Sequence, residues 1–331
     1  MRDTAVAFQP PLPPELVRSL LEFWGRLFQT DYEPFRGMLS GGECEQNRDV
    51  IYVLKSAGKI AGTCHLTMAE SNPAAGGLGE VGTEPEFRSL GIAGQLCKRA
   101  RDDFKAAGGR ALFLGTSNPV AARVYGRLGW RKLAGANVMV SVSDEDTPQE
   151  FFLDYFRGGA ATNIVAGSAA DRVPMVPLIV APHDWQLMDA NTDIHSTRRV
   201  NQGSCMGLYP RYASLTRNGS GTWFAARTDQ RRTVGLSTAR LDGQDGCQVD
   251  GFVHTNYSPD RHRVGSIVWE RLLQASVSWA VDQGARSCWA KISSEDEDKL
   301  CCFRAIGFAR ACEDESIDRN GHQIMTMALK N

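Results

Sequence analysis

Long apolar runs are absent from this 331-residue sequence, and Met1-Arg2-Asp3 leads into no apolar core of the kind that secretion signals have. We therefore expect no membrane span and a cytoplasmic location. An excess of either charge is also missing, since 37 basic and 38 acidic residues give a formal net charge of −1. A near-neutral chain gives no argument for nucleic acid or an anionic membrane as a partner, so any anion site must be local.

Short-spaced ligand motifs are missing as well. The nine cysteines are scattered, with Cys301 and Cys302 adjacent and no Cys-x-x-Cys pair, which indicates reduced thiols rather than disulfides or a zinc site. The six histidines show no His-Glu-x-x-His pattern. We therefore expect no bound metal.

The sequence does have a glycine-rich turn at residues 88–94, which reads Arg-Ser-Leu-Gly-Ile-Ala-Gly and opens a predicted helix. Glycine lets the backbone approach a ligand closely, and the first amide groups of a helix point outward without partners. Together with the helix dipole they form a site for a phosphate or pyrophosphate. The Walker ending Gly-Lys-Ser/Thr is absent, and the glycine spacing does not fit the dinucleotide fingerprint Gly-x-Gly-x-x-Gly.

Periodicity places this turn in a strand, turn, helix, strand, helix unit. Residues 80–84 are predicted as a strand that Pro85 stops. The next helix ends at Gly108-Gly109, and its apolar side recurs at spacings of three and four, with Leu90, Ala93, Leu96, Cys97, Ala100 and Phe104. A buried strand is predicted at 111–114. Asn118 is then a predicted N-cap, with Pro119 in the first helical position and Gly129 after the last.

Two motifs in this unit resemble the GNAT superfamily of acyl-CoA-dependent N-acyltransferases, in the right order and with a strand between them. Arg88-x-x-Gly91-x-Ala93-Gly94, after Pro85-Glu86-Phe87, is similar to the family's pyrophosphate loop. Asn118-Pro119-x-Ala121-x-x-x-Tyr125-x-x-Leu128-Gly129-Trp130 is similar to its second CoA motif. The resemblance implies acetyl-CoA as cosubstrate and a binding site made of Val81, Gly82, Thr83, Arg88, Ser89, Leu90, Gly91, Ile92, Ala93, Gly94 and Asn118.

The resemblance also implies catalytic roles. Attack of a primary amine on a thioester requires that the amine loses a proton, the oxyanion is stabilised and the leaving sulfur gains a proton. Tyr125 matches the family position that donates to sulfur, and backbone groups at Val81 and Thr83 match those that meet the pantetheine arm and the thioester oxygen. Glu80 is the first candidate for the base. His65, Tyr32, Glu33 and a water chain are the alternatives.

The resemblance covers residues 1–142. We expect a strand at 4–9, a hairpin of 50–54 with 60–68, a glycine-rich stretch at 72–79 and a last strand at 138–140. Two helices precede the hairpin, one with an apolar face of Leu16, Leu20, Phe23, Trp24 and Leu27, the other with Tyr32, Phe35 and Met38. A connector at 143–173 then holds a capping box at Thr147 and Glu150, a helix through Arg157, and a small polar segment at 158–170 that suits a surface linker.

Residues 174–331 repeat this pattern weakly. Strands are expected at 223–227, 233–241, 248–254 and 287–292, residues 259–265 parallel 85–91, and 300–308 parallel the helix before Trp130. The motif is eroded, because His262, Val268, Asp296 and Phe303 stand where the first half has Arg88, Gly94, Asn118 and Tyr125. We therefore expect a degenerate GNAT-like domain without catalysis, although Arg261 and Arg263 keep some anion binding open.

The sequence as a whole predicts an α/β (α+β) protein with two tandem GNAT-like domains, each a mixed, mostly antiparallel sheet flanked by helices. The predicted activity is transfer of an acetyl group from acetyl-CoA to the primary amine of a small molecule or peptide, in the N-terminal domain. Two alternatives stay open: another acyl-CoA enzyme (an O- or S-acyltransferase or an acyl-thioester decarboxylase), and a non-catalytic acyl-CoA sensor. The acceptor and a homodimer are also left open.

Overall fold

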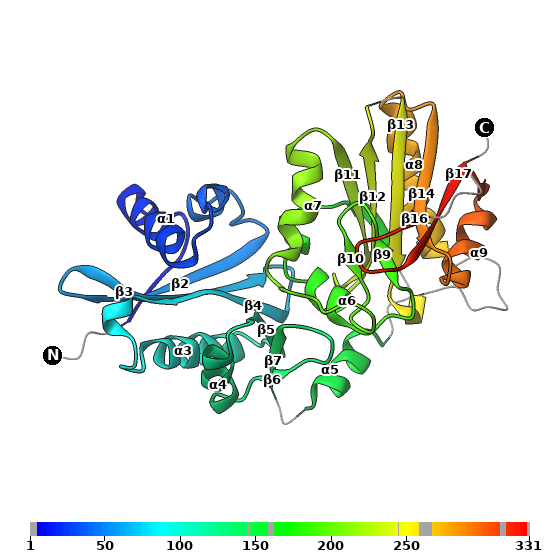
Figure 1. Cartoon of the computed structure of the whole chain (residues 1–331). Coiled ribbons are helices and arrows are strands. Elements are labelled where there is room, and N and C mark those ends of the chain that lie inside the picture. The colour runs from blue at the N-terminus through cyan, green and yellow to red at the C-terminus, as the bar shows by residue number, and fades with distance from the viewer. Residues whose placement is uncertain are drawn as a thin grey trace. The chain divides into compact units, whose positions relative to one another are not determined.

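The computed structural model describes residues 5–143, 146–157, 162–243, 245–257, 267–311 and 316–329. The chain divides into two compact units, each built around one sheet (Figure 1). The first unit comprises residues 1–133, 137–151 and 203–206, and the second comprises 134–136, 152–202 and 207–331. No helix in the described part of the chain is both long and apolar enough to cross a membrane.

The sheet of the first unit has seven strands in the order β1-β2-β3-β4-β5-β7-β6, and only the β4–β5 pair is parallel. Its elements in chain order are β1 (Val6–Phe8), α1 (Pro14–Phe28), η1 (Glu33–Phe35), α2 (Arg36–Leu39), β2 (Asn47–Ser56), β3 (Lys59–Ala69), β4 (Asn72–Thr83), η2 (Pro85–Phe87), α3 (Ile92–Ala106), β5 (Ala111–Gly115), α4 (Pro119–Arg127), β6 (Arg131–Lys132) and β7 (Val138–Val142). Helix α5 (Pro148–Tyr155) follows and opens with the predicted capping box, in which Thr147 and Glu150 exchange hydrogen bonds.

Alternation along β2 divides the core of this unit between the two faces of the sheet. Val50, Tyr52 and Leu54 pack with α3 on one face, and Ile51 and Val53 pack with α1 on the other. The two faces of the sheet therefore have different neighbours, α3 on one and α1 on the other.

The second unit repeats this topology. Its strands are ordered β8-β11-β12-β13-β14-β17-β15, with one parallel pair, β13–β14, and β16 added beside β17. Its elements are β8 (Thr162–Ala166), η3 (Ala169–Asp171), α6 (Met175–Val180), β9 (Leu187–Asp189), β10 (Ile194–His195), α7 (Leu208–Arg217), β11 (Gly221–Thr228), β12 (Thr233–Leu241), β13 (Gly246–Val253), η4 (Thr255–Tyr257), α8 (Ile267–Asp282), β14 (Ser287–Ser293), α9 (Glu297–Ala305), β15 (Phe308–Arg310), β16 (Ser316–Ile317) and β17 (Gln323–Leu329). Helices α8 and α9 occupy the places in chain order that α3 and α4 have in the first unit.

Three details of the sequence-based prediction are wrong. The strand predicted at 80–84 begins earlier, at Asn72, because ladders to β3 and β5 on both sides hold the glycine-rich residues 72–79 extended. Leu90 does not lie on the apolar face of α3: the helix starts only at Ile92, and Leu90 is 70% exposed. The segment 158–170, expected as a linker, contains β8, which pairs with β11 in the second sheet.

The predicted loop at 259–265 lies outside the described residues, and with it Arg261, His262, Arg263 and Gly265.

Candidate active site

A bulge in β4 lies where the sequence analysis placed the thioester. Thr63 pairs with Gly82 and His65 with Gly79, so that two residues of β4, Glu80 and Val81, stand opposite one residue of β3. Glu80 has a φ of +47°, a conformation that costs free energy for a residue other than glycine. The bulge is fixed from behind, because the Thr63 hydroxyl donates to the Glu80 carbonyl over 2.7 Å and accepts from the Trp24 indole at 2.9 Å. Backbone strain held in place by such supports is typical of functional sites.

The parallel ladder between β4 and β5 stops just before this bulge. Its last pair is Leu78 with Leu114, and β4 then continues to Thr83 while β5 ends at Gly115. The backbone groups that Gly79–Thr83 direct to the β5 side are therefore not part of that ladder. An extended amide-containing ligand such as a pantetheine arm could pair with them.

The bulge turns the Glu80 carboxylate toward a buried histidine. His65 Nδ1 lies 2.9 Å from Glu80 Oε2, and His65 Nε2 lies 2.7 Å from Asp49 Oδ1. Burial by itself lowers the pKa of His65, but the hydrogen bonds and charges of Asp49 and Glu80 outweigh it and raise that pKa to about 9. Below this pH the cluster is an imidazolium between two carboxylates, with one net negative charge when both carboxylates are ionised.

Of the alternative bases, Tyr32 lies near this cluster and Glu33 is engaged elsewhere. The Tyr32 ring packs 5.5 Å from Trp24, and burial together with the charge of Glu80 raises the pKa of its hydroxyl. Glu33 instead forms an exposed ion pair with Arg36 at 2.7 Å, whose hydrogen bond lowers the pKa of the Glu33 carboxyl. The structure thus brings Glu80, His65 and Tyr32 together and sets Glu33 apart in an ion pair of its own.

The raised pKa of His65 makes the stability of the folded protein depend on pH. Its pKa in the folded protein, about 9, lies above the ordinary value of 6.5, so folding favours the protonated ring. This stabilisation is fully present below pH 6.5 and is lost as the pH rises through 9, by about 3 kcal/mol at most. We expect NMR titration of imidazole-labelled protein to show one histidine still protonated at pH 8, and His65→Gln to remove that signal. Titration of every histidine near pH 6.5, His65 included, would contradict the Asp49–His65–Glu80 cluster.

The predicted anion loop has the geometry of a helix N-terminus open to solvent. Gly91, with a φ of +80°, caps α3, and the helical ladder begins with the hydrogen bond from Gln95 N to Gly91 O at 3.0 Å. No side chain caps this end within the described residues, so the amides of Ile92, Ala93 and Gly94 precede the first helical bond. Residues 88–91 are exposed, and a Cβ built on Gly91 would meet open space. The loop can therefore present several amide donors to a phosphate.

Arg88 and Asn118 are held by different contacts. Arg88 is exposed and its Nε donates to the Thr83 carbonyl at 3.4 Å, which ties the loop to the end of β4. Asn118 caps α4 as predicted, since its Oδ1 accepts from Val120 N at 2.9 Å and Ala121 N at 3.4 Å. Its contact with a CoA arm stays a prediction.

Tyr125, the predicted acid, is buried on α4. Its ring lies 6.2 Å from that of Trp130, the residue is 6% exposed, and its hydroxyl has no hydrogen-bond partner among the described residues. Burial raises the pKa of the Tyr125 hydroxyl, and the neighbouring thiols Cys97 and Cys64 add to this. The group therefore keeps its proton at all physiological pH values and has a donor free for a ligand.

Sequence reasoning missed two parts of this region. Asp49 escaped notice although an acid in a strand of apolar residues is a signal in itself. The segment 203–206 belongs to the first unit but comes from far along the chain. Its Met206 lies over β4 so closely that a Cβ on Gly77 would come within 2.3 Å of the sulfur, and burial together with the charge of Glu80 raises the pKa of the Cys205 thiol to about 12.

Two cavities flank α1. The larger, of about 670 Å³, lies between α1 and the adjoining ends of β3 and β4, and the Arg26–Glu84 ion pair is part of its lining. The other, of about 450 Å³, is lined by Tyr32 and by the segment that follows α1. Glu80 and Tyr125 line neither cavity, so we define the candidate site by the bulge, the loop and Tyr125 and not by cavity size.

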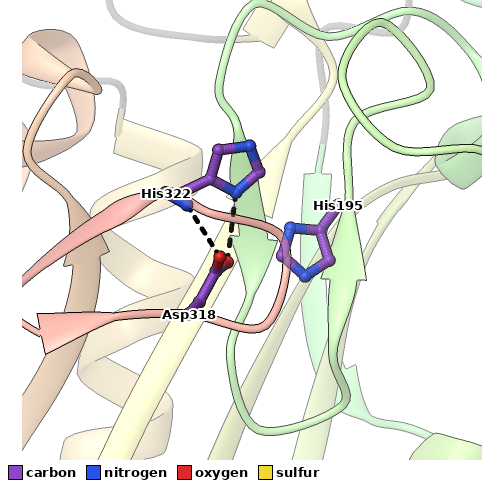
Figure 2. Close-up of side chains that lie close together, drawn as sticks. All are labelled: His195, Asp318 and His322. Carbon is purple, nitrogen blue, oxygen red and sulfur yellow. Dashed lines mark hydrogen bonds and ion pairs between the residues drawn. The ribbon is translucent and has the colours of Figure 1, made fainter.

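Potential metal ligands gather in the second unit and share no residue with this site. His195, Asp318 and His322 each offer one ligand atom, and these atoms lie within 4.8 Å of one another (Figure 2).

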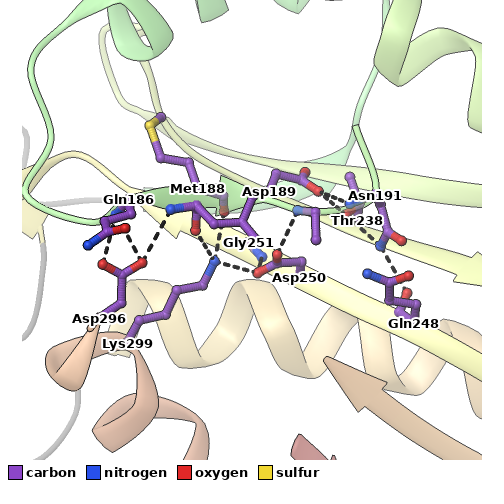
Figure 3. Close-up of polar contacts among 12 residues, drawn as sticks. Gln186, Met188, Asp189, Asn191, Thr238, Gln248, Asp250, Gly251, Asp296 and Lys299 are labelled. Carbon is purple, nitrogen blue, oxygen red and sulfur yellow. Dashed lines mark hydrogen bonds and ion pairs between the residues drawn. The ribbon is translucent and has the colours of Figure 1, made fainter. Parts of the chain in front are cut away.

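The positions of the second unit that parallel Asn118 and Tyr125 serve the core. Asp296 accepts hydrogen bonds from Gln186 N at 2.8 Å and Leu187 N at 3.2 Å (Figure 3). Phe303 is fully buried against Trp269 and Phe308. Strand β13 pairs with β12 without the register shift that makes the β4 bulge. Asp250, which follows the last β13–β14 pair at the same distance as Glu80 follows the last β4–β5 pair, is bound by Lys299 at 2.7 Å.

Comparison with known proteins finds a family match for part of the first unit. Residues 14–130 match the model of the Acetyltransferase (GNAT) family, which identifies this segment as a GNAT acetyltransferase domain and indicates an acyltransferase. The match covers the bulge of β4, the loop and Tyr125. The rest of the chain lies outside it, and no curated protein matches the sequence.

Several solved acetyltransferases are similar to about half of the chain. A ribosomal-protein-alanine N-acetyltransferase from Brucella melitensis shares 14% identity over 50% of this chain and 98% of its own, with a TM-score of 0.39. A putative acetyltransferase from Acinetobacter baylyi shares 11% identity over 53% and 94%, also at 0.39. A chimera of the spermidine N-acetyltransferase SpeG from Vibrio cholerae and hSSAT shares 10% over 51% and 94%, at 0.39. Identities and TM-scores this low add nothing to what the match of residues 14–130 shows.

Proposed function

We propose that the first unit transfers an acetyl group from acetyl-CoA to a primary amine, and that the second unit has no acyl-CoA site. The observation that carries this proposal is that one matched segment, residues 14–130, holds the strained bulge, the open helix N-terminus and the free Tyr125 hydroxyl. The domain boundaries we propose are those of the sequence analysis, except that β8 belongs to the second domain.

In this mechanism the pyrophosphate of acetyl-CoA binds the amides at the start of α3, beside Arg88. The pantetheine arm runs along Gly79–Thr83, where the ladder with β5 has ended, and this places the thioester at the bulge. The backbone amide of Val81 is the donor we assign to the thioester oxygen.

The acceptor first gives up the extra proton of its ammonium form to Glu80 or through water, and this frees the nitrogen lone pair. The nitrogen then attacks the thioester carbonyl carbon, a C–N bond forms and the C–S bond breaks. The nitrogen becomes acidic once it is bonded to the carbonyl carbon, and its second proton leaves through water. The net negative charge of the Asp49–His65–Glu80 cluster supports an amine as acceptor, since an amine approaches as a cation.

Tyr125 faces the departing sulfur in this scheme. A thiol has an ordinary pKa of about 8.5, below that of a buried tyrosine, so complete proton transfer from Tyr125 to the thiolate is uphill. A hydrogen bond from the hydroxyl to the developing thiolate is favourable, and solvent supplies the final proton. We therefore assign Tyr125 the role of a hydrogen-bond donor to the leaving group.

The proposal is tested by mass spectrometry of products formed from isotopically labelled acetyl-CoA and a panel of amines, alcohols and thiols. We expect label in an amide, and a lower yield with Glu80→Gln. Label in an ester or thioester would transfer the assignment to the alternative acyltransferases, and binding of acetyl-CoA without any product would favour a sensor.

A further inference from the structure

The second unit brings together two imidazoles and one carboxylate from segments that are far apart in the sequence. His195 ends the short strand β10, Asp318 directly follows β16, and His322 directly precedes β17. One ligand atom from each lies within 4.8 Å of the other two. In Figure 2 the His195 ring lies beside the His322–Asp318 pair and turns a ring nitrogen toward it.

Hydrogen bonds in the turn between β16 and β17 fix the positions of Asp318 and His322. Asp318 accepts from the backbone amides of Asn320 and His322 at 2.8 Å each, and its second oxygen lies 3.1 Å from His322 Nδ1. This ion pair is the ordinary alternative to a metal site, since a histidine beside an aspartate satisfies both. It leaves the third member of the cluster unexplained.

His195 is that third member, and its hydrogen bonding is incomplete. The residue is 6% exposed, and its Nδ1 is buried with no hydrogen-bond partner among the described residues. Its Nε2 lies 3.3 Å from Asp193 Oδ1 and 3.1 Å from Asn320 Nδ2. A neutral ring with hydrogen on Nε2 donates to Asp193 and leaves a bare lone pair on the buried Nδ1, which is how metal-bound histidines are arranged. In this tautomer the Asn320 amide turns its oxygen, and not its nitrogen, toward Nε2.

Charge and space also fit a cation. Asp193 stands behind His195, itself paired with Arg319, and Asp318 supplies a carboxylate on the other side. His195 and Asp318 line a cavity of about 170 Å³, which leaves room for water or a small ligand on the open side. Lys291 lines the same cavity and would favour an anion as that further ligand.

We propose that His195 Nδ1, His322 and Asp318 bind a divalent first-row transition metal, with at least one coordination position open to the cavity. Two histidines and a carboxylate with open positions form the ligand set of Zn²⁺ and Fe²⁺ sites, whereas Mg²⁺ and Ca²⁺ prefer oxygen ligands throughout. The bound ion would tie β10 to the β16–β17 hairpin, and it is independent of the acyl-transfer proposal.

The test is a calorimetric titration of chelator-treated full-length protein with Zn²⁺, in a background without the two thiols that are exposed in the described part of the chain (Cys44→Ser, Cys301→Ser) and without Cys312, which lies outside it (Cys312→Ser). We expect one Zn²⁺ per chain with a Kd of about 1 µM or tighter, and a rise in Tm on saturation. His195→Gln and Asp318→Asn should each weaken binding by about 100-fold or more, while His254→Gln, a histidine outside the cluster, should not.

Two readouts guard against misleading outcomes. Co²⁺ should give the absorption of a nitrogen and oxygen ligand set, and far-UV circular dichroism should show that each variant is folded before it is titrated. No binding, equal binding of Mg²⁺, or binding that survives both His195→Gln and Asp318→Asn in folded protein would overturn the proposal.

Discussion

Replacing Tyr125 with Phe is expected to lower turnover by about 100-fold while the Kd for acetyl-CoA changes by less than about two-fold. The hydroxyl is the only group lost. The ring keeps its packing against Trp130, and the hydroxyl has no partner among the described residues whose loss would disturb the fold. A donor needed only when the C–S bond breaks affects the transition state and not the ground state.

Tyr52 offers a matched control for this substitution. Tyr52 belongs to the same buried cluster as Tyr125, but its hydroxyl donates a hydrogen bond to Asp103 at 2.8 Å. Tyr52→Phe should therefore reduce stability by about 1 kcal/mol and leave turnover unchanged. Equal turnover of Tyr125→Phe and wild type across the pH range would remove Tyr125 from the mechanism.

Lys299→Met is expected to destabilise the second unit by about 3 to 5 kcal/mol. Lys299 is fully buried, and its ammonium group uses all three donors, to Asp250 Oδ1 at 2.7 Å, Leu187 O at 2.7 Å and Met188 O at 2.9 Å (Figure 3). Without it Asp250 becomes a buried charge with no counterion. Burial already raises the pKa of Asp250 to about 6, and Lys299 is what opposes that rise.

Urea unfolding followed by tryptophan fluorescence measures this loss, because the Lys299 ammonium lies 5.8 Å from the Trp185 ring. Lys291→Met is the control, since Lys291 is exposed on β14, and it should cost less than about 0.5 kcal/mol. The double variant Lys299→Met/Asp250→Asn should recover part of the stability. A loss below 1 kcal/mol for Lys299→Met alone would show that the ion pair is not what holds this region together.

Much of the fold and part of the site could be predicted, because both depend on local sequence signals. Asn118 and Pro119 mark the start of α4 through steric and capping preferences that need no tertiary context. The repeat of strand and helix order in the second half was also visible. Leu90 was wrongly placed on the helix, which begins only at Ile92, since periodicity alone does not show that Gly91 adopts a positive φ.

The rest of the site depends on contacts between distant segments. The bulge at Glu80 exists because β3 and β4 slip in register, and no local pattern marks that slip. Asp49 matters only once the pairing of β2 with β3 brings it within hydrogen-bond distance of His65. Met206 reaches Gly77 of β4 from more than a hundred residues further along the chain. His195 is likewise joined to Asp318 and His322 only by folding, so a search for short-spaced metal motifs could not find the cluster.

Calorimetric titration with acetyl-CoA shows whether the protein has a single acyl-CoA site and whether that site lies at the start of α3. Gly91→Asp and Gly108→Asp make a matched pair, because both glycines have a φ near +80° and open space at the Cβ, at opposite ends of the same helix. We predict one site per chain, lost or weakened at least about ten-fold in Gly91→Asp by repulsion of phosphate, and retained in Gly108→Asp. Two sites per chain, or equal binding by both variants, would contradict this prediction.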